Sequence, residues 1–474
     1  MTTERPILVW IRRDCRLSDH PALYHACKSG QLVIPFYIWD PISELPWKPG
    51  SASKSWLHHS LRSFQKQLNK RGSRLLIRKG DSLTEIRRLI RETSATDVVW
   101  NRSHEPSSIA RDTILKQSLL TAGTKACSFQ GNTLIEPWDF SNKSGRPFQV
   151  FTPFWKQHRL VYQHTSPLPE PKIIRSIASH MALPSVDLDS LGLEPEVGWD
   201  KQFYKRFQPG EEGAKSSLNR FIKEQILSYS TDRNMPSIRG TSRLSPHLHF
   251  GEISPRQVFD EIINSTDPGS GPGTFLTELG WREFAIHLLY HFPHSTQAPL
   301  KAIFGNFPWQ ENPEALEKWK KGQTGIPIID AGMRELWETG WMHNRVRMIA
   351  ASYLVKNLMI PWQKGAEWFW DTLVDADLAS NSLGWQWVAG SGADAAPYFR
   401  IFNPVLQSKR FDPQGDYIRE WVPELTPLSS KQIHTPWEYP DVLAKTEYPE
   451  KHISLIASRD RALRAYELMK GALP

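Results

Sequence analysis

VDADLASNSLGWQWVAGSGADAAPYFRIFNP, residues Val374–Pro404, places two carboxylates and an amide before two tryptophans, and a run of small residues after them. The polar and aromatic positions are Asp375, Asp377, Asn381, Trp385 and Trp387. A structural core rarely surrounds tryptophan with so many polar and small residues. The mixture predicts a pocket in which backbone comes close to a large flat ligand. Such a ligand supplies chemistry that side chains cannot supply.

Length and composition limit the number of domains, the class of protein and the cellular compartment. The chain has 474 residues, which predicts two or three domains, and its net charge of +8 is a modest excess that fits an ordinary basic enzyme or a polyanion-binding protein. Three cysteines without CxxC spacing favour a reducing compartment and no disulfides. The N-terminus lacks a long apolar segment, and no run of 18 apolar residues occurs. We therefore expect a cytoplasmic protein that does not bind membranes.

Short apolar runs alternate with helical patterns between residues 6 and 135. The apolar runs are Ile7–Ile11, Val33–Ile38, Arg74–Ile77, Val98–Trp100 and Lys125–Phe129. The helical patterns are Trp56–Lys70, a segment that starts at Ser82 with Glu85 as a capping box, and Ser107–Leu120. This alternation predicts an α/β domain with a doubly wound parallel sheet.

The rest of the chain has a different character. Prolines such as Pro167, Pro169 and Pro171 predict a connector over residues 136–199. From residue 200 to residue 474, helical periodicity predicts a larger all-α domain. The expected boundaries are therefore 1–135, 136–199 and 200–474.

The first part of the helical region contains two groups of residues that could form a binding site. In Tyr229–Ser245, Gly240 precedes hydroxyls that suit a phosphate or pyrophosphate at a helix start; a simple N-cap is the alternative. In the helix Phe275–Tyr290, Glu278, Trp281 and Arg282 share a face by spacing. An exposed ion pair beside a core tryptophan explains that face equally well.

A third group is GWMHNRVRM, residues Gly340–Met348. Gly340 can end one helix, and Asn344, Arg347 and Met348 then share a face of the next, with Arg345 pointing elsewhere. An amide suits the edge of a planar ligand and methionine gives an adaptable apolar contact, although plain core packing also explains Met348.

The remaining polar groups leave alternatives open. Asp375 and Asp377 lack a histidine or third carboxylate at ligand spacing, so no metal site is expected, while general acid/base catalysis stays open. Basic residues interleaved with aromatics over Tyr398–Arg410 fit a nucleic-acid surface or a solvated loop.

Taken in order, these motifs resemble the photolyase/cryptochrome flavoproteins over essentially the whole chain. The resemblance rests on WIRRDCRLSDHPAL, GTSRLSPHLHFGEIS, LGWREF, WMHNRVRM, the opening run and FDPQGDYIREWVPEL. It implies FAD in the helical domain, and it leaves open a second, antenna chromophore of folate or deazaflavin type. The implied FAD-binding residues are Tyr229, Thr241, Ser242, Arg243, Leu244, Ser245, Phe275, Arg282, Arg347, Asp375, Asp377 and Asn381.

The resemblance also implies an electron-transfer chain of three tryptophans. Trp385 would be nearest the flavin, Trp362 intermediate and Trp309 at the surface. Asn381 would face the flavin N5, where an amide resembles the photolyase branch. Spacing alone could not select these three from twenty tryptophans.

The implied substrate is DNA that carries pyrimidine dimers, acted on by a protein expected to be a monomer. In the (6-4) photolyase branch, the positions of Asn344 and Met348 carry histidines, so the resemblance favours a cyclobutane dimer photolyase with Glu278, Asn344, Met348 and Asn381 as catalytic residues. The implied DNA-binding residues are Arg233, Glu278, Trp281, Asn344, Arg345, Trp387, Arg400 and Gln407. A cryptochrome photoreceptor without repair activity is the main alternative. The end of the chain at Pro474, with no long tail, favours the enzyme.

Overall fold

The chain forms two compact units, each of which is described by itself. The structure is a computed structural model that describes residues 5–176, 183–267, 269–395 and 399–471. The first unit consists of Met1–Phe148, Thr152–Ile226 and Ser242–His291. The second consists of Gln149–Phe151, Leu227–Thr241 and Phe292–Pro474.

The first unit contains a parallel sheet of five strands in the order β3-β2-β1-β4-β5. The strands are β1 (Ile7–Ile11), β2 (Val33–Trp39), β3 (Leu76–Lys79), β4 (Asp97–Asn101) and β5 (Lys125–Phe129). Every residue of β1 and β2 is buried, which explains why these strands read as unbroken apolar runs. The predicted doubly wound sheet is confirmed, and each observed strand overlaps its predicted run.

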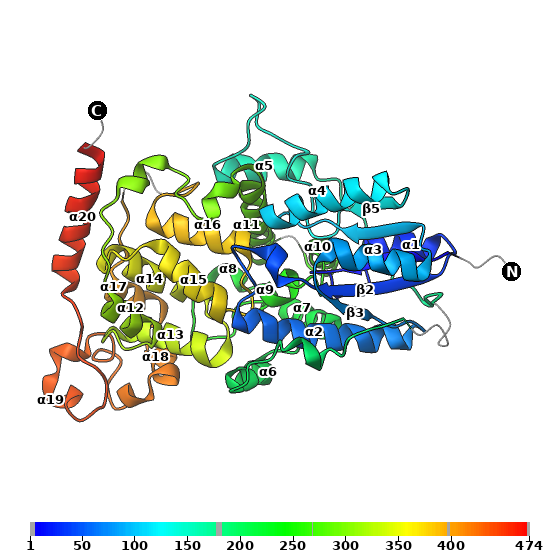
Figure 1. Ribbon diagram of the computed structural model, residues 1–474. Helices are drawn as coiled ribbons and strands as arrows, with labels where there is room; N and C mark the ends of the chain where they lie inside the picture. Colours follow the sequence, from blue (N-terminus) through cyan, green and yellow to red (C-terminus); the bar gives the residue numbers. More distant parts are fainter. Residues whose placement is uncertain (1–4, 177–182, 268, 396–398, 472–474) are drawn as a thin grey trace. The chain divides into compact units, whose positions relative to one another are not determined.

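Helices cover this sheet (Figure 1). Ile86 and Leu89 of α3 (Ser82–Thr93) and Leu115 and Leu119 of α4 (Pro106–Thr121) join one hydrophobic core with sheet residues that include Trp10. The other helices of this part of the chain are α1 (Pro21–Lys28), α2 (Ser51–Lys70), α5 (Phe151–Val161), α6 (Phe203–Arg206), α7 (Glu211–Glu224), α9 (Ser245–His249), α10 (Pro255–Ser265) and α11 (Ser270–His291).

Two local predictions differ from the structure. The N-cap of α3 is Asp81, whose side chain accepts a hydrogen bond from the Thr84 N–H at 2.8 Å, so the predicted capping box at Ser82 is wrong by one residue. The Ser82 hydroxyl instead donates to Asp40 at 2.7 Å. The stretch predicted as a connector also contains the 11-residue helix α5.

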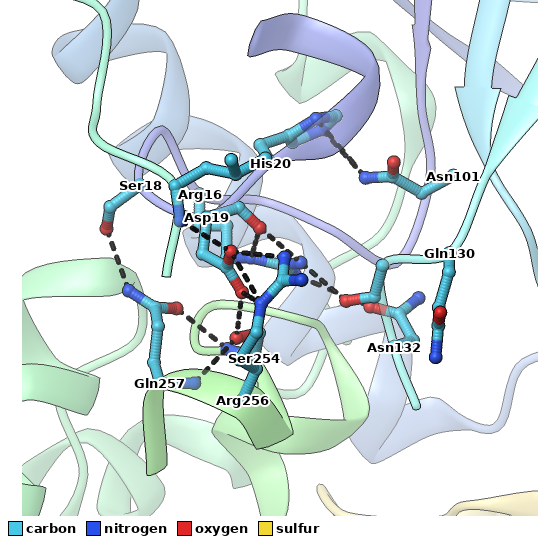
Figure 2. A network of polar contacts seen from close by, with 12 residues as sticks. Arg16, Ser18, Asp19, His20, Asn101, Gln130, Asn132, Ser254, Arg256 and Gln257 are labelled. Atoms are coloured by element: carbon cyan, nitrogen blue, oxygen red, sulfur yellow. Dashed lines mark hydrogen bonds and ion pairs between the residues drawn. The ribbon is translucent and has the colours of Figure 1, made fainter. Parts of the chain in front are cut away.

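A buried polar network ties the N-terminal motif RLSDH to the start of α10 (Figure 2). Arg16 donates to the carbonyl oxygens of Asp19 at 2.9 Å and of Gly251 at 2.9 Å. The Asp19 carboxylate accepts from Arg256 Nε at 3.0 Å, while Ser254 caps α10. Asp19 has a φ of +51°, a backbone conformation that a surrounding network must hold in place. Two motifs more than 230 residues apart in the chain are therefore part of one structural joint.

The second unit is helical, and its described residues contain no β-strand. Its helices are α8 (Tyr229–Asp232), α12 (Pro313–Lys320), α13 (Pro327–Thr339), α14 (Asn344–Ser352), α15 (Trp362–Thr372), α16 (Leu378–Ala389), α17 (Pro404–Phe411), α18 (Asp416–Trp421), α19 (Pro440–Leu443) and α20 (Leu455–Gly471). The predicted helical character of the C-terminal region is confirmed. Among the described residues of the chain, none of the helices combines the length and hydropathy that a bilayer span requires.

Candidate functional site

A cavity of about 170 Å³ opens between α14, α15 and α16 of the second unit. Seven of the predicted site residues line it: Asn344, Arg347, Met348, Asp375, Asp377, Asn381 and Trp385. The other lining residues are Ala351, Phe369, Leu373, Ala376, Ser380, Gly384 and Val388. We call this space the α14–α16 cavity.

The start of α14 sets one wall of the cavity. Gly340 ends α13 in the left-handed conformation, with a φ of +66°, and the His343 side chain caps α14 by accepting from the Arg345 N–H. The helix therefore begins at Asn344, and the spacing to Met348 places both side chains on the wall. The predicted shared face is confirmed.

The opposite wall comes from α16. Asp377 is its N-cap and accepts a hydrogen bond from the Ser380 N–H at 2.8 Å. One turn later, Asn381 donates through Nδ2 to the carbonyl oxygen of Ala366 on α15, at 3.1 Å. This bond fixes the orientation of the amide. Ser380, Gly384 and Val388 were missed by the sequence reasoning, although helical spacing from Asp377 places them on the same face.

An ion pair fixes the cationic group of the cavity. Arg347 donates to the Asp375 carboxylate at 2.8 Å and, through Nε, to the carbonyl oxygen of Met342 at 2.7 Å. The Asp375 side chain is 2% exposed and the Arg347 side chain 24% exposed. A charged guanidinium held in this way contributes a fixed positive charge at the cavity wall.

Trp385 is buried among aromatic rings. Its ring lies 5.0 Å from the ring of Phe369 and 6.2 Å from that of Trp319, and the residue is only 3% exposed. Gly365 of α15 lies directly against it, since a Cβ at Gly365 would be 2.0 Å from Trp385 Cη2. Phe369 and Trp319 carried no signal in the sequence that would distinguish them from core aromatics.

The other two tryptophans of the predicted chain also lie in the second unit. Trp362 is the first residue of α15 and is 2% exposed. Trp309 is half-buried, with its ring 4.5 Å from that of Phe307. Trp309 is the most exposed of the three, as its predicted outer position requires, while the order of Trp385 and Trp362 and the electron-transfer role stay predictions.

The predicted pyrophosphate segment passes from one unit to the other at Ser242. In the second unit, Tyr229 is buried in α8, and Gly240 allows close approach, because a Cβ there would be 2.5 Å from the Asp232 carbonyl oxygen. In the first unit, the Ser242 hydroxyl accepts from the Leu244 N–H at 3.3 Å. The remaining predicted residues of this segment are Thr241, which is half-buried, Arg243, which has a φ of +53°, and Ser245, which begins α9.

The predicted residues on α11 belong to the first unit. Glu278, Trp281 and Arg282 are all half-buried, and Phe275 is 6% exposed. Arg282 donates to the carbonyl oxygen of Asn132 at 2.8 Å and to the Glu283 carboxylate at 3.2 Å. The guanidinium is thus anchored to a backbone carbonyl oxygen. The alternative interpretation, an exposed ion pair beside a core tryptophan, did not include this contact.

The predicted DNA-binding residues of the second unit do not all gather at one place. Arg345 donates to the Asn234 side chain, next to Arg233, and Trp387 donates to the Asp394 carbonyl oxygen at 3.1 Å. Arg400 is exposed and lines a groove beside α20, and Gln407 is half-buried on α17. Tyr398, which begins the predicted basic and aromatic run, lies outside the described residues.

Comparison with known proteins places the chain in a family. A family model described as the FAD binding domain of DNA photolyase matches residues 275–468, and one described as DNA photolyase matches residues 7–172. A deoxyribodipyrimidine photo-lyase of Agrobacterium fabrum is 44% identical over 98% of this chain and 98% of its own length. The chain belongs to the DNA photolyase and cryptochrome family.

The similar proteins include both cryptochromes and photolyases. Cryptochrome-2 of Arabidopsis thaliana is 37% identical over 100% of this chain and 82% of its own length. A crystal structure of a class III photolyase from Agrobacterium tumefaciens superimposes with a TM-score of 0.95, at 44% identity, covering 100% of this chain and 99% of that one. The resemblance on which the sequence analysis rested is therefore confirmed.

The α14–α16 cavity fits the flat ring system of FAD, the cofactor of this family. Ala351 and Ala376 are small, and a Cβ at Gly384 would meet no atom within 4 Å, so open space lies beside the backbone there. Arg347 and Asn381 add one fixed cation and one fixed amide. A mostly apolar cavity with a few oriented polar groups is the usual form of a cofactor site.

Proposed function

We propose that this protein repairs cyclobutane pyrimidine dimers in ultraviolet-damaged DNA, in a reaction driven by light. The observation that carries the proposal is that Asn344 and Met348 line one cavity with Arg347, Asn381 and Trp385. Neither Asn344 nor Met348 can donate or accept a proton by ionising. Splitting a cyclobutane dimer needs an electron to arrive and to return, without a group transfer that requires a proton relay. A pair that cannot ionise suits this lesion.

The bound FAD supplies light absorption and the transferable electron. The chain's own residues hold and tune it. Asp375 holds the Arg347 guanidinium in place at the cavity wall through the 2.8 Å ion pair. Asn381 presents a neutral amide whose orientation is fixed by Ala366, so it can hydrogen-bond a ring edge without taking part in acid/base chemistry.

We further propose roles for the residues that would meet DNA. Glu278 hydrogen-bonds the pyrimidine edge, and Trp281 and Trp387 are apolar walls for a dimer flipped out of the duplex. Flipping costs a few kcal/mol in general and less for a damaged pair. Phosphates flanking the lesion are held by Arg233, Arg345, Arg400 and Gln407.

Lesion-specific repair assays test the proposed function. Oligonucleotides that carry one cyclobutane dimer or one (6-4) lesion are illuminated with blue light in the presence of protein with reduced flavin. We expect loss of the cyclobutane dimer only. Loss of the (6-4) lesion alone would contradict the lesion assignment, and loss of neither would favour a photoreceptor. Met348→Leu, which conserves volume and stays non-ionisable, is a control expected to retain repair.

Three wider assignments belong to the same proposal. A cytoplasmic location is supported by the free thiols of Cys15, Cys27 and Cys127, and the monomeric state stays a proposal. The domain division 1–135, 136–199 and 200–474 stays a proposal, because the family models match 7–172 and 275–468 and do not mark those boundaries. An antenna chromophore in the N-terminal domain, of unspecified type, completes the proposed cofactor set.

A further inference from the structure

A cluster of metal-ligating groups lies in the first unit and takes no part in the proposed function. His58 and His59 are consecutive residues of α2, and Glu194 lies in the segment that follows the short helix Asp189–Leu191. One ligand atom from each of the three residues lies within 4.8 Å of the other two. The sequence gave no reason to group them, because Glu194 is far from the histidines along the chain.

The His58 side chain is buried without a hydrogen bond. It is 1% exposed, and neither Nδ1 nor Nε2 has a hydrogen-bond partner. Buried polar groups are nearly always satisfied, and leaving one unmet costs about 1–3 kcal/mol. Edge-on packing against Tyr204, at 4.0 Å between ring centroids, accounts for the position of His59, but it leaves the open nitrogens of His58 unexplained.

Two distances between ligand atoms lie in the range expected for a tetrahedral ion. Zn²⁺ lies about 2.0–2.2 Å from histidine nitrogens and carboxylate oxygens, so two ligands of a tetrahedral site are about 3.3–3.6 Å apart. His58 Nε2 is 3.3 Å from Glu194 Oε2, and His59 Nε2 is 3.6 Å from Glu194 Oε1. Asp189 Oδ1 is 3.5 Å from His58 Nε2, which puts a fourth donor beside the cluster.

The local charge also favours a dication. The carboxylates of Asp189, Glu194 and the buried Asp200 lie near His58, and the nearby cation Arg62 pairs with Asp189.

We propose that His58, His59 and Glu194 bind a divalent transition-metal ion, with Zn²⁺ as the best match to two imidazoles and a carboxylate. The remaining coordination position is open to water or to Asp189. The ion would fasten α2 to the segment that carries Glu194 and so stabilise the first unit. This role is independent of the light-driven repair.

Metal binding to the full-length, flavin-loaded protein tests the proposal. After treatment with a chelator and its removal, Zn²⁺ is titrated by calorimetry into the parent protein, Glu194→Gln and Glu196→Gln. Both substituted side chains are exposed, so both variants should fold, and Glu196 is a matched carboxylate two residues from the ligand. Thermal unfolding with and without Zn²⁺ is measured in parallel.

We expect one tight Zn²⁺ equivalent in the parent and in Glu196→Gln, with a rise in Tm on adding the ion. Glu194→Gln should bind at least about tenfold more weakly, since the loss of even an outer-shell partner costs that much. Equal binding by the two variants, or no tight equivalent in the parent, would overturn the proposal. Repair activity should be the same in all three proteins, so failure here is distinct from failure of the proposed function.

Discussion

Gly365→Ala probes how tightly α15 holds Trp385. The added methyl would lie 2.0 Å from Cη2, 2.4 Å from Cζ3 and 2.6 Å from Cζ2 of the indole, whereas ordinary contacts begin at 3.4 Å. The ring would have to retreat by more than 1 Å, and the rings of Phe369 and Trp319 stand in contact with it. Overpacking of this kind costs about 1–3 kcal/mol, while alanine returns at most about 1 kcal/mol of helix propensity. We expect a net loss of about 1–2 kcal/mol.

Chemical denaturation and flavin photoreduction measure the two consequences. A matched control is Gly273→Ala on α11, where a Cβ would meet nothing within 4 Å and helix propensity should raise stability slightly. Gly365→Ala should also photoreduce more slowly, because the indole is displaced, while chemically reduced protein should keep repairing dimers. If Gly365→Ala were as stable as the Gly273→Ala control and photoreduced at the parent rate, the contact between Gly365 and Trp385 would not hold the indole in place.

Three further outcomes are expected. Trp385→Phe should slow photoreduction and leave repair by pre-reduced protein largely intact; equal loss of both, measured by flavin absorbance and dimer loss, would contradict the relay role. Arg400→Ala should weaken DNA binding and flatten its dependence on salt in titrations at several salt concentrations, because one phosphate contact is lost. Burial raises the pKa of Asp330 from 3.8 to about 6, so the folded state binds the proton more tightly, and the free energy of unfolding should fall by about 2 kcal/mol as pH rises from 4 to 6. Asp330→Asn should flatten that part of the pH profile of unfolding; an unchanged slope would show that another group titrates there.

The sequence was most informative where a local rule decides the outcome. Unbroken apolar runs predicted the parallel sheet, and the left-handed Gly340 with i, i+3 and i+4 spacing predicted the α14 wall of the cavity. The start of α3 was missed by one residue because Asp81 and Ser82 are both good caps, and only the tertiary bond from Ser82 to Asp40 distinguishes them.

Contacts between distant segments were beyond the reach of the sequence. Spacing cannot reveal that Ala366 orients Asn381, because that bond depends on how α15 packs against α16. Spacing also cannot reveal that the ring of Trp319 packs against Trp385, because in the sequence Trp319 is indistinguishable from other core aromatics. The roles of the flavin-binding residues came from the family resemblance, since their side chains have no distinctive spacing of their own.

The residues with the two proposed roles lie on different helices of the cavity wall. Asn344 and Met348, the residues that would distinguish one lesion from another, lie on α14, whereas Asn381 and Trp385, which would set the cofactor and supply it with electrons, lie on α16. The Arg347–Asp375 ion pair fastens α14 to the segment just before α16. Met348→His, which introduces an ionisable group, should therefore change lesion preference without changing photoreduction, whereas Trp385→Phe should slow photoreduction without changing lesion preference. Asp375→Asn should impair both, because it releases Arg347 and removes a buried charge partner.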